Sequence, residues 1–65
     1  MDGKVDAIHE TQAYGWIKGE DGKRYFFHRT ALTNRKMHEL FPGDAVIFEP
    51  SRSEKGLRTD TVEAV

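Results

Sequence analysis

Cysteine is absent from this 65-residue chain, and other missing features narrow the possibilities further. Without cysteine there is no disulfide framework, no thiolate zinc site and no cysteine nucleophile. No stretch approaches the roughly 18 apolar residues of a membrane span, and Met1 to Val5 lack the apolar run of a signal peptide. A strong net charge is lacking too, since the formal value is −1. We therefore expect one small cytoplasmic domain, residues 1–65, that binds no membrane.

Aromatic residues, by contrast, are frequent for so short a chain. One Trp, two Tyr and four Phe are too many for a disordered tail. The charge is also unevenly spread: residues 18–38 carry a net +4, while residues 1–17 and 39–65 carry −2 and −3. A basic middle segment is usually an ordinary solvated surface. It indicates a binding surface only if the aromatic side chains share its face.

Five short segments have the composition of β-strands and are separated by turn signals, a spacing typical of a small all-β protein. They are residues 3–9, 13–18, 23–28, 45–49 and 57–64. Asp21-Gly22 predicts a tight hairpin between the second and third, and Pro42-Gly43-Asp44 predicts a turn before the fourth. The predicted fold is a five-stranded antiparallel OB-type barrel with a short helical segment between strands three and four.

That helical segment is predicted from a change of periodicity. Met37, Leu40 and Phe41 are spaced as one face of a short helix, with Thr33 or Asn34 as its N-cap. We expect all three apolar side chains to pack on the barrel. Alternation along the strands supplies most of the predicted core, which comprises Val5, Ile17, Tyr25, Phe27, Leu32, Leu40, Val46, Phe48 and Val62.

The same alternation places four rings outside. If Ile17 points into the core, Tyr14 and Trp16 point outward, and Phe26 and His28 do so on the neighbouring strand. An exposed aromatic cluster usually marks a site. Rings along two strands are suited to stacking unpaired bases, and each stack is worth about 1–3 kcal/mol. Burial of this face against a second copy or another protein is the alternative interpretation.

Two motifs on these strands resemble a known family. Tyr14-Gly15-Trp16-Ile17 and Tyr25-Phe26-Phe27-His28 look like the paired RNP motifs, usually Phe-Gly-Phe-Ile and Val-Phe-Val-His, of the cold-shock domain. The resemblance extends over essentially the whole chain, through Gly3-Lys4-Val5, Thr30-Ala31-Leu32, the spacing from Leu40 to Glu49, Lys55-Gly56 and Val62. It implies an OB barrel that binds single-stranded RNA and DNA. It also implies stacking by the four rings and contacts from Lys4 and Lys55.

The chain departs from the family pattern at several positions. The usual Lys-Trp-Phe of the first strand is replaced by Asp6-Ala7-Ile8, and the usual Lys-Gly before Tyr14 by Gln12-Ala13. Lys23-Arg24 stand where an acidic residue is common, and Arg29 stands where a Phe usually follows the second motif. We therefore expect a binding surface shifted towards strands two and three, with weaker binding or a different footprint.

The predicted function is binding of single-stranded nucleic acid, RNA more than DNA, with little sequence preference, a role like that of an RNA chaperone and no enzymatic activity. The predicted binding residues are Lys4, Tyr14, Trp16, Lys18, Lys23, Arg24, Phe26, His28, Arg29 and Lys55. His9, His28 and His38 lack companions at metal-ligand spacing, so we expect no metal, cofactor or catalytic residue. The predicted state is a monomer or weak homodimer, and a protein-interaction or dimerisation module is the alternative.

Overall fold

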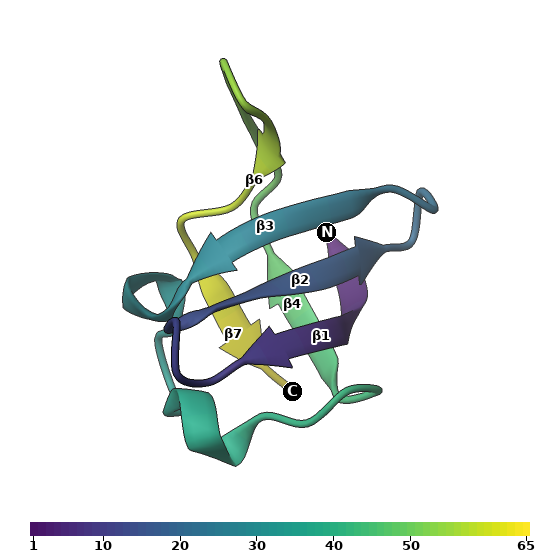
Figure 1. The fold of residues 1–65 in the computed structure, drawn as a ribbon. Coiled ribbons are helices and arrows are strands. Elements are labelled where there is room, and N and C mark those ends of the chain that lie inside the picture. Colours follow the sequence, from purple (N-terminus) through teal and green to yellow (C-terminus); the bar gives the residue numbers. More distant parts are fainter.

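Seven strands form one curled sheet in the computed structural model, which describes residues 1–65 (Figure 1). They are β1 (Asp2–His9), β2 (Tyr14–Gly19), β3 (Arg24–His28), β4 (Ala45–Phe48), β5 (Ser51–Ser53), β6 (Gly56–Arg58) and β7 (Val62–Ala64). Their order across the sheet is β5-β6-β3-β2-β1-β4-β7. Two short 3-10 turns, η1 (Arg29–Ala31) and η2 (Met37–Glu39), lie between β3 and β4. Neither is long or apolar enough to cross a membrane. The fold is all-β and OB-like, as predicted.

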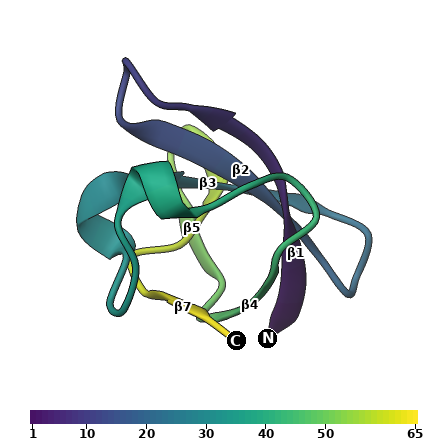
Figure 2. The ribbon, with the colours of Figure 1, turned by 90° about the horizontal axis from the view of Figure 1, so that it is seen from below.

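The barrel is closed by the segment that follows β3. Leu32 forms an isolated parallel bridge with Val62 of β7, and the Thr33 amide donates to the Val62 carbonyl at 3.0 Å. The Asn34 side chain holds the next residues of β7, donating to the Ala64 carbonyl and accepting from the Ala64 amide, both at 2.9 Å. Figure 2 shows the resulting ring of strands, with the 3-10 segment lying over one opening.

The predicted hairpin between β2 and β3 is present. Gly22 has φ 81°, a left-handed conformation that suits glycine. The Asp21 carboxylate accepts from the Lys23 amide at 2.9 Å and from the Tyr25 hydroxyl at 2.5 Å. The Tyr25 hydrogen bond, followed by that of the Lys23 amide, lowers the pKa of Asp21. The same hydrogen bond raises the pKa of Tyr25, because it favours the neutral phenol.

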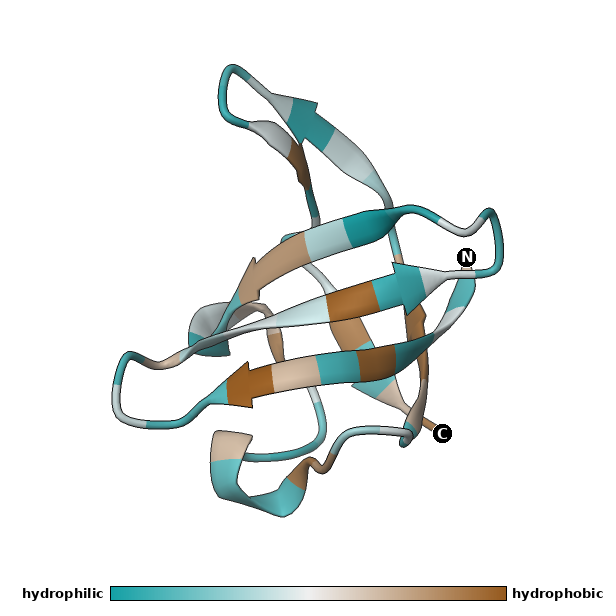
Figure 3. Cartoon of the chain, turned by 45° about the vertical axis from the view of Figure 1, so that its right-hand side comes forward, coloured by the Kyte–Doolittle hydropathy of each residue, from teal (hydrophilic) through white to brown (hydrophobic).

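The core lies inside the curled sheet and agrees closely with the alternation along the strands. Its ten buried apolar residues are Val5, Ile17, Tyr25, Phe27, Ala31, Met37, Leu40, Val46, Phe48 and Val62. Eight of the nine predicted core residues are among them, whereas Leu32 is only partly buried against the cluster. Figure 3 shows hydrophobic and hydrophilic positions following one another along β1. The inward face of each strand therefore supplies the core and the outward face is free for other roles.

The predicted helix is wrong in its length, its cap and one of its buried residues. Only the single turn η2 forms, with Lys36 as its N-cap. Met37 and Leu40 are buried, but the Phe41 side chain is 63% exposed. The polar residues expected to cap the helix, Thr33 and Asn34, instead bond to β7. Because those bonds close the barrel, the segment cannot also begin a helix at that point.

The predicted fifth strand, residues 57–64, is divided in the structure. Its first part belongs to β6, which pairs with β5 in a hairpin that stands away from the rest of the barrel (Figure 1). Its second part is β7, which pairs with β4. Buried Thr59 lies between them, and its hydroxyl donates to the Thr61 carbonyl at 3.0 Å. That local bond turns the chain, so one predicted strand becomes two, and β5 brings the total to seven.

Candidate nucleic-acid interface

The outward face of β1, β2 and β3 is organised in rows fixed by the strand register. In the first row, Tyr14 of β2 lies between His9 of β1 and His28 of β3. In the second, Trp16 lies between Ala7 and Phe26, and in the third, Lys18 lies between Lys4 and Arg24. Side chains opposite one another in an antiparallel pair share a face. One row therefore carries imidazoles, one carries large rings and one carries cations.

A β-bulge explains why Ala7 and His9 belong to this face. The β1–β2 register shifts between Val5 and Ala7, leaving Asp6 without a partner on β2. Val5 is buried opposite Ile17, so strict alternation would also send Ala7 and His9 inward. The extra residue of a bulge reverses that alternation. The first strand therefore adds a ring, His9, to the outward face.

The rings of this face touch one another in a continuous series. The His9 and Tyr14 rings stack with centroids 4.7 Å apart, and the Tyr14 and Phe26 centroids lie 5.4 Å apart. Trp16 meets Phe26 edge-on at 5.5 Å. We call the predicted set Tyr14, Trp16, Phe26 and His28 the aromatic face, and all four residues are half-buried. Their partial exposure leaves ring surface on which a flat ligand can stack.

Arg24 extends the aromatic face with a flat cation. Its guanidinium carbon lies 4.8 Å from the centroid of a Trp16 ring. Its Nε also lies 2.9 Å from Oδ2 of Asp6, the bulged residue of β1. Both side chains of this ion pair are about half exposed, at 53% and 40%. Stacking and pairing together hold the positive charge of Arg24 at the edge of the rings.

A hollow separates the rings from the projecting β5–β6 hairpin. We call it the hairpin hollow, and its volume is about 430 Å³. It is lined by Trp16, Phe26, Ser53, Lys55, Leu57 and Arg58. Apolar surface therefore lies beside two cationic side chains. Ligand sites combine apolar walls with a few polar groups in the same way, within a volume of about 300–1,000 Å³.

The comparisons with known proteins agree on one family. The profile described as 'Cold-shock' DNA-binding domain matches residues 1–65. Cold shock protein 1 of Lactiplantibacillus plantarum is 33% identical over 54 residues, which cover 83% of this chain and 82% of that protein. This chain belongs to the cold-shock domain family. Cold-shock domains bind nucleic acids, and in this one the expected stacking positions form the aromatic face.

Two departures from the usual cold-shock pattern prove to be one structural change. The common first-strand Lys is Asp6 here, and the acidic residue common before Tyr25 is replaced by Lys23-Arg24. In the structure Asp6 and Arg24 form the ion pair described above. Compared with the family pattern, the anion is now on β1 and the cation on β3, on opposite sides of β2. The net charge of the pair is unchanged. This cold-shock domain thus keeps a cation beside its rings, now on β3 and stacked on Trp16.

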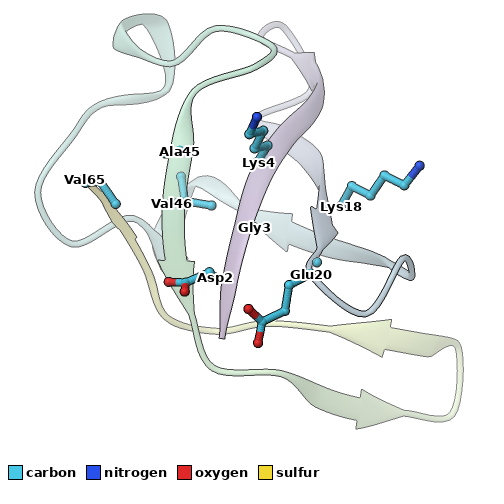
Figure 4. A pocket seen from close by; sticks show the side chains of 9 residues that line it. Asp2, Gly3, Lys4, Lys18, Glu20, Ala45, Val46 and Val65 are labelled. Carbon is cyan, nitrogen blue, oxygen red and sulfur yellow. The ribbon is translucent and has the colours of Figure 1, made fainter.

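Lys4 and Lys18 lie on the outward face but in a mixed electrostatic setting. Both line a second hollow, which also contains Asp2 and Glu20 (Figure 4). In that view the two lysine side chains leave the sheet in different directions. Because two carboxylates accompany the two lysines, this end of the face has no net formal charge.

The remaining predicted residues occupy the margins. Lys23 is exposed in the β2–β3 turn, and Arg29 is exposed in η1, one residue beyond β3. The His28 ring is oriented by Thr30, whose amide donates to Nδ1 at 3.3 Å. The structure holds no group of three metal-ligating side chains. The described interface therefore consists of rings, guanidinium groups and lysines.

Sequence reasoning missed His9 on the outward face, and Ser53, Leu57 and Arg58 in the hairpin hollow. His9 reaches the face only because of the bulge, and no residue pattern in the first strand signals that bulge. Arg58 enters the hairpin hollow because β6 pairs with β3, with Phe26 and Arg58 in parallel register. The prediction treated residues 57–64 as one strand and did not place it beside β3. The sequence shows that Lys55 and Arg58 are basic, but only the pairing of β6 with β3 shows that they lie beside the rings.

Proposed function

We propose that this cold-shock domain binds single-stranded nucleic acid, RNA more strongly than DNA, and that it does so without catalysis. Unpaired bases stack on the aromatic face, while cations near the rings, among them Arg24 and Lys55, attract the phosphates. Little sequence preference is expected from stacking, because every base has a π-face. By holding RNA unpaired in the cytoplasm, the domain acts as an RNA chaperone.

The observation that carries this proposal is the series of touching rings across two paired strands. Tyr14, Phe26 and Trp16 follow one another at 5.4 and 5.5 Å between centroids, with Arg24 beside Trp16 at one end. Successive bases of a single strand can lie along such a series. The family relationship supports the same proposal, since the cold-shock domain is a nucleic-acid-binding family.

Charge argues against burial of this face in a homodimer. A two-fold interface brings the same surface of both copies together. Lys23, Arg29 and Lys55 form no ion pair, so the interface would gather these cations from both copies, and like charges repel. We therefore propose a monomer. Sedimentation at increasing protein concentration tests this, and a dimer formed without nucleic acid would support the protein-interaction alternative.

Trp16 is the only tryptophan, so its fluorescence reports on the aromatic face directly. Titration with matched pyrimidine-rich RNA and DNA strands should quench it to saturation, with tighter binding of the RNA. With three or four phosphates neutralised, log K should fall against log salt with a slope of about −2 to −3. A folded protein whose fluorescence is unchanged at low salt would contradict the proposal. Melting of a fluorescently labelled RNA hairpin by the protein tests the chaperone role separately.

A further inference from the structure

Arg58 has hydrogen-bonding capacity that the protein itself does not use. Its side chain is 39% exposed, and its Nη2 donates to Oδ1 of Asp60 at 2.9 Å. Its Nε is covered by protein and has no hydrogen-bond partner. A covered donor without an acceptor is unfavourable, and such groups are few in native proteins. A ligand cannot reach the covered Nε, but Nη1 has no partner within the protein and belongs to a side chain that is partly exposed, so Nη1 is the donor left for a ligand.

The position of Arg58 relative to the rings defines what kind of ligand it meets. It is the register partner of Phe26 and lines the hairpin hollow together with Trp16. Because the two rings meet edge-on, a base stacks on one of them, and it presents its edge, not its face, to the residue beside that ring. Asp60 holds one end of the guanidinium and so limits its rotation. Arg58 is thus placed to donate hydrogen bonds to the edge of a base.

We propose that the hairpin hollow is a base-reading subsite that prefers guanine and that Arg58 is its specificity-determining residue. This inference rests on the proposed function and adds one selective position to an otherwise sequence-tolerant face. Arginine has five N–H donors and no acceptor, so its ligand must supply acceptors. Guanine presents O6 and N7 side by side, and arginine commonly binds that pair.

Other bases fit this subsite less well. Adenine has the same two rings as guanine but carries an N6 amino donor in place of the O6 acceptor, so it opposes a guanidinium. Uracil and cytosine have a single ring and cover less of Trp16 and Phe26. Lys55, also in the hollow, provides the charge that attracts the adjoining phosphate. The preference for guanine thus combines ring area with acceptor pattern.

The test uses uracil heptamers that carry one central guanine, adenine, cytosine or 7-deazaguanine, with Trp16 fluorescence as the readout. The guanine strand should bind about tenfold more tightly than the adenine strand. Loss of N7 in 7-deazaguanine should remove part of that advantage. Arg58→Gln should reduce the guanine-to-adenine ratio to one or below, because glutamine pairs well with adenine. Arg58→Lys keeps the charge but not the planar pair of donors, and should retain only part of the preference, because an ammonium group can also donate to O6 and N7.

Arg52→Gln is the matched control, because Arg52 lies on the same hairpin but does not line the hollow. It removes the same charge and should leave the guanine-to-adenine ratio unchanged. Circular dichroism checks that each variant is folded. Equal weakening of all strands by Arg58→Gln, with affinity retained in Arg58→Lys, would make Arg58 a phosphate contact and overturn the inference. Equal affinity of the wild type for all strands would overturn it while leaving the proposed function intact, whereas no binding of any strand would overturn both.

Discussion

Ala7 of β1 lies directly opposite Trp16 of β2, so the smallest side chain of this row is next to the largest ring. The family commonly has a Trp at the first of these positions and a Phe at the second. In this chain the indole ring is on β2 instead of β1, next to Phe26 and the hairpin hollow. The large rings are therefore centred on β2 and β3, beside Arg24 and Arg58.

Trp16→Ala should weaken binding of a single-stranded heptamer by about 1–3 kcal/mol, the value of one lost stack. Folding should be largely unaffected, because Trp16 is half-buried and outside the core. Anisotropy of a labelled strand measures the binding, since this variant has no tryptophan. Trp16→Phe is the control and should retain most of the affinity. If Trp16→Ala unfolds at room temperature, the ring is a core residue and the aromatic face is misassigned.

Asp6→Asn should strengthen nucleic-acid binding about threefold at low salt. A unit charge about 7 Å from a phosphate contributes about 0.6 kcal/mol in water, and this substitution removes a repulsive one. Stability should change by less than about 1 kcal/mol, because the ion pair with Arg24 is exposed. Glu63→Gln on β7 removes the same charge away from the rings and should have a smaller effect. Weaker binding by Asp6→Asn would mean that the ion pair is needed to position Arg24.

Ala13→Gly should stabilise the fold by about 0.5–1 kcal/mol. Ala13 has φ 60°, a left-handed conformation that costs a residue with a Cβ about 1–2 kcal/mol. Glycine removes that cost but adds freedom to the unfolded chain, worth about 0.4–1 kcal/mol. Urea denaturation measures the difference. The control Ala45→Gly lies within β4 and should destabilise, and a destabilised Ala13→Gly would contradict the argument from strain.

Asp21→Asn should destabilise the domain by an amount that depends on pH. The Tyr25 hydroxyl lowers the pKa of Asp21. The Asp21 carboxylate therefore makes its full contribution to the free energy of unfolding above the ordinary pKa of 3.8. That contribution is lost as the pH falls through the lowered pKa. The pKa of Tyr25 is raised. The contribution of its hydroxyl to the free energy of unfolding is therefore complete below the ordinary pKa of 10.0 and is lost at higher pH.

The free energy of unfolding, measured by urea denaturation, should therefore differ between wild type and Asp21→Asn by a constant amount from about pH 5 to 9. The difference should shrink below and above that range. Asp60→Asn is the matched control, because that carboxylate has no contact with Tyr25 and pairs with Arg58. A wild-type advantage that persists unchanged at about pH 2 would show that the Asp21 carboxylate does not act through its charged form.

The strands and most of the core follow from the sequence because alternation has a direct physical cause. Ile17 and Phe27 are buried and Trp16 and Phe26 are not, since successive side chains of a strand leave it on opposite sides. The aromatic face was predictable for the same reason. Alternation assumes a regular strand, and the bulge before Ala7 breaks that regularity. For this reason His9 was not predicted to lie on the outward face.

Tertiary contacts decided the remaining differences. Phe41 has helical spacing with Met37, but Asn34 is bonded to β7 and only one turn forms. Arg58 was missed because its role depends on β6 lying beside β3. These features result from contacts between residues far apart in the chain, which local patterns do not contain.

The projecting β5–β6 hairpin gives the hairpin hollow one wall that is held more loosely than the other. On the barrel side the rings stand on β2 and β3, which pair along five residues each. On the other side β6 meets β3 through the single pair Phe26 and Arg58, with one further bond from the Thr59 amide to the Phe26 carbonyl. Segments with few such contacts open at the lowest free energies. The hairpin should therefore exchange its amide hydrogens before the barrel does.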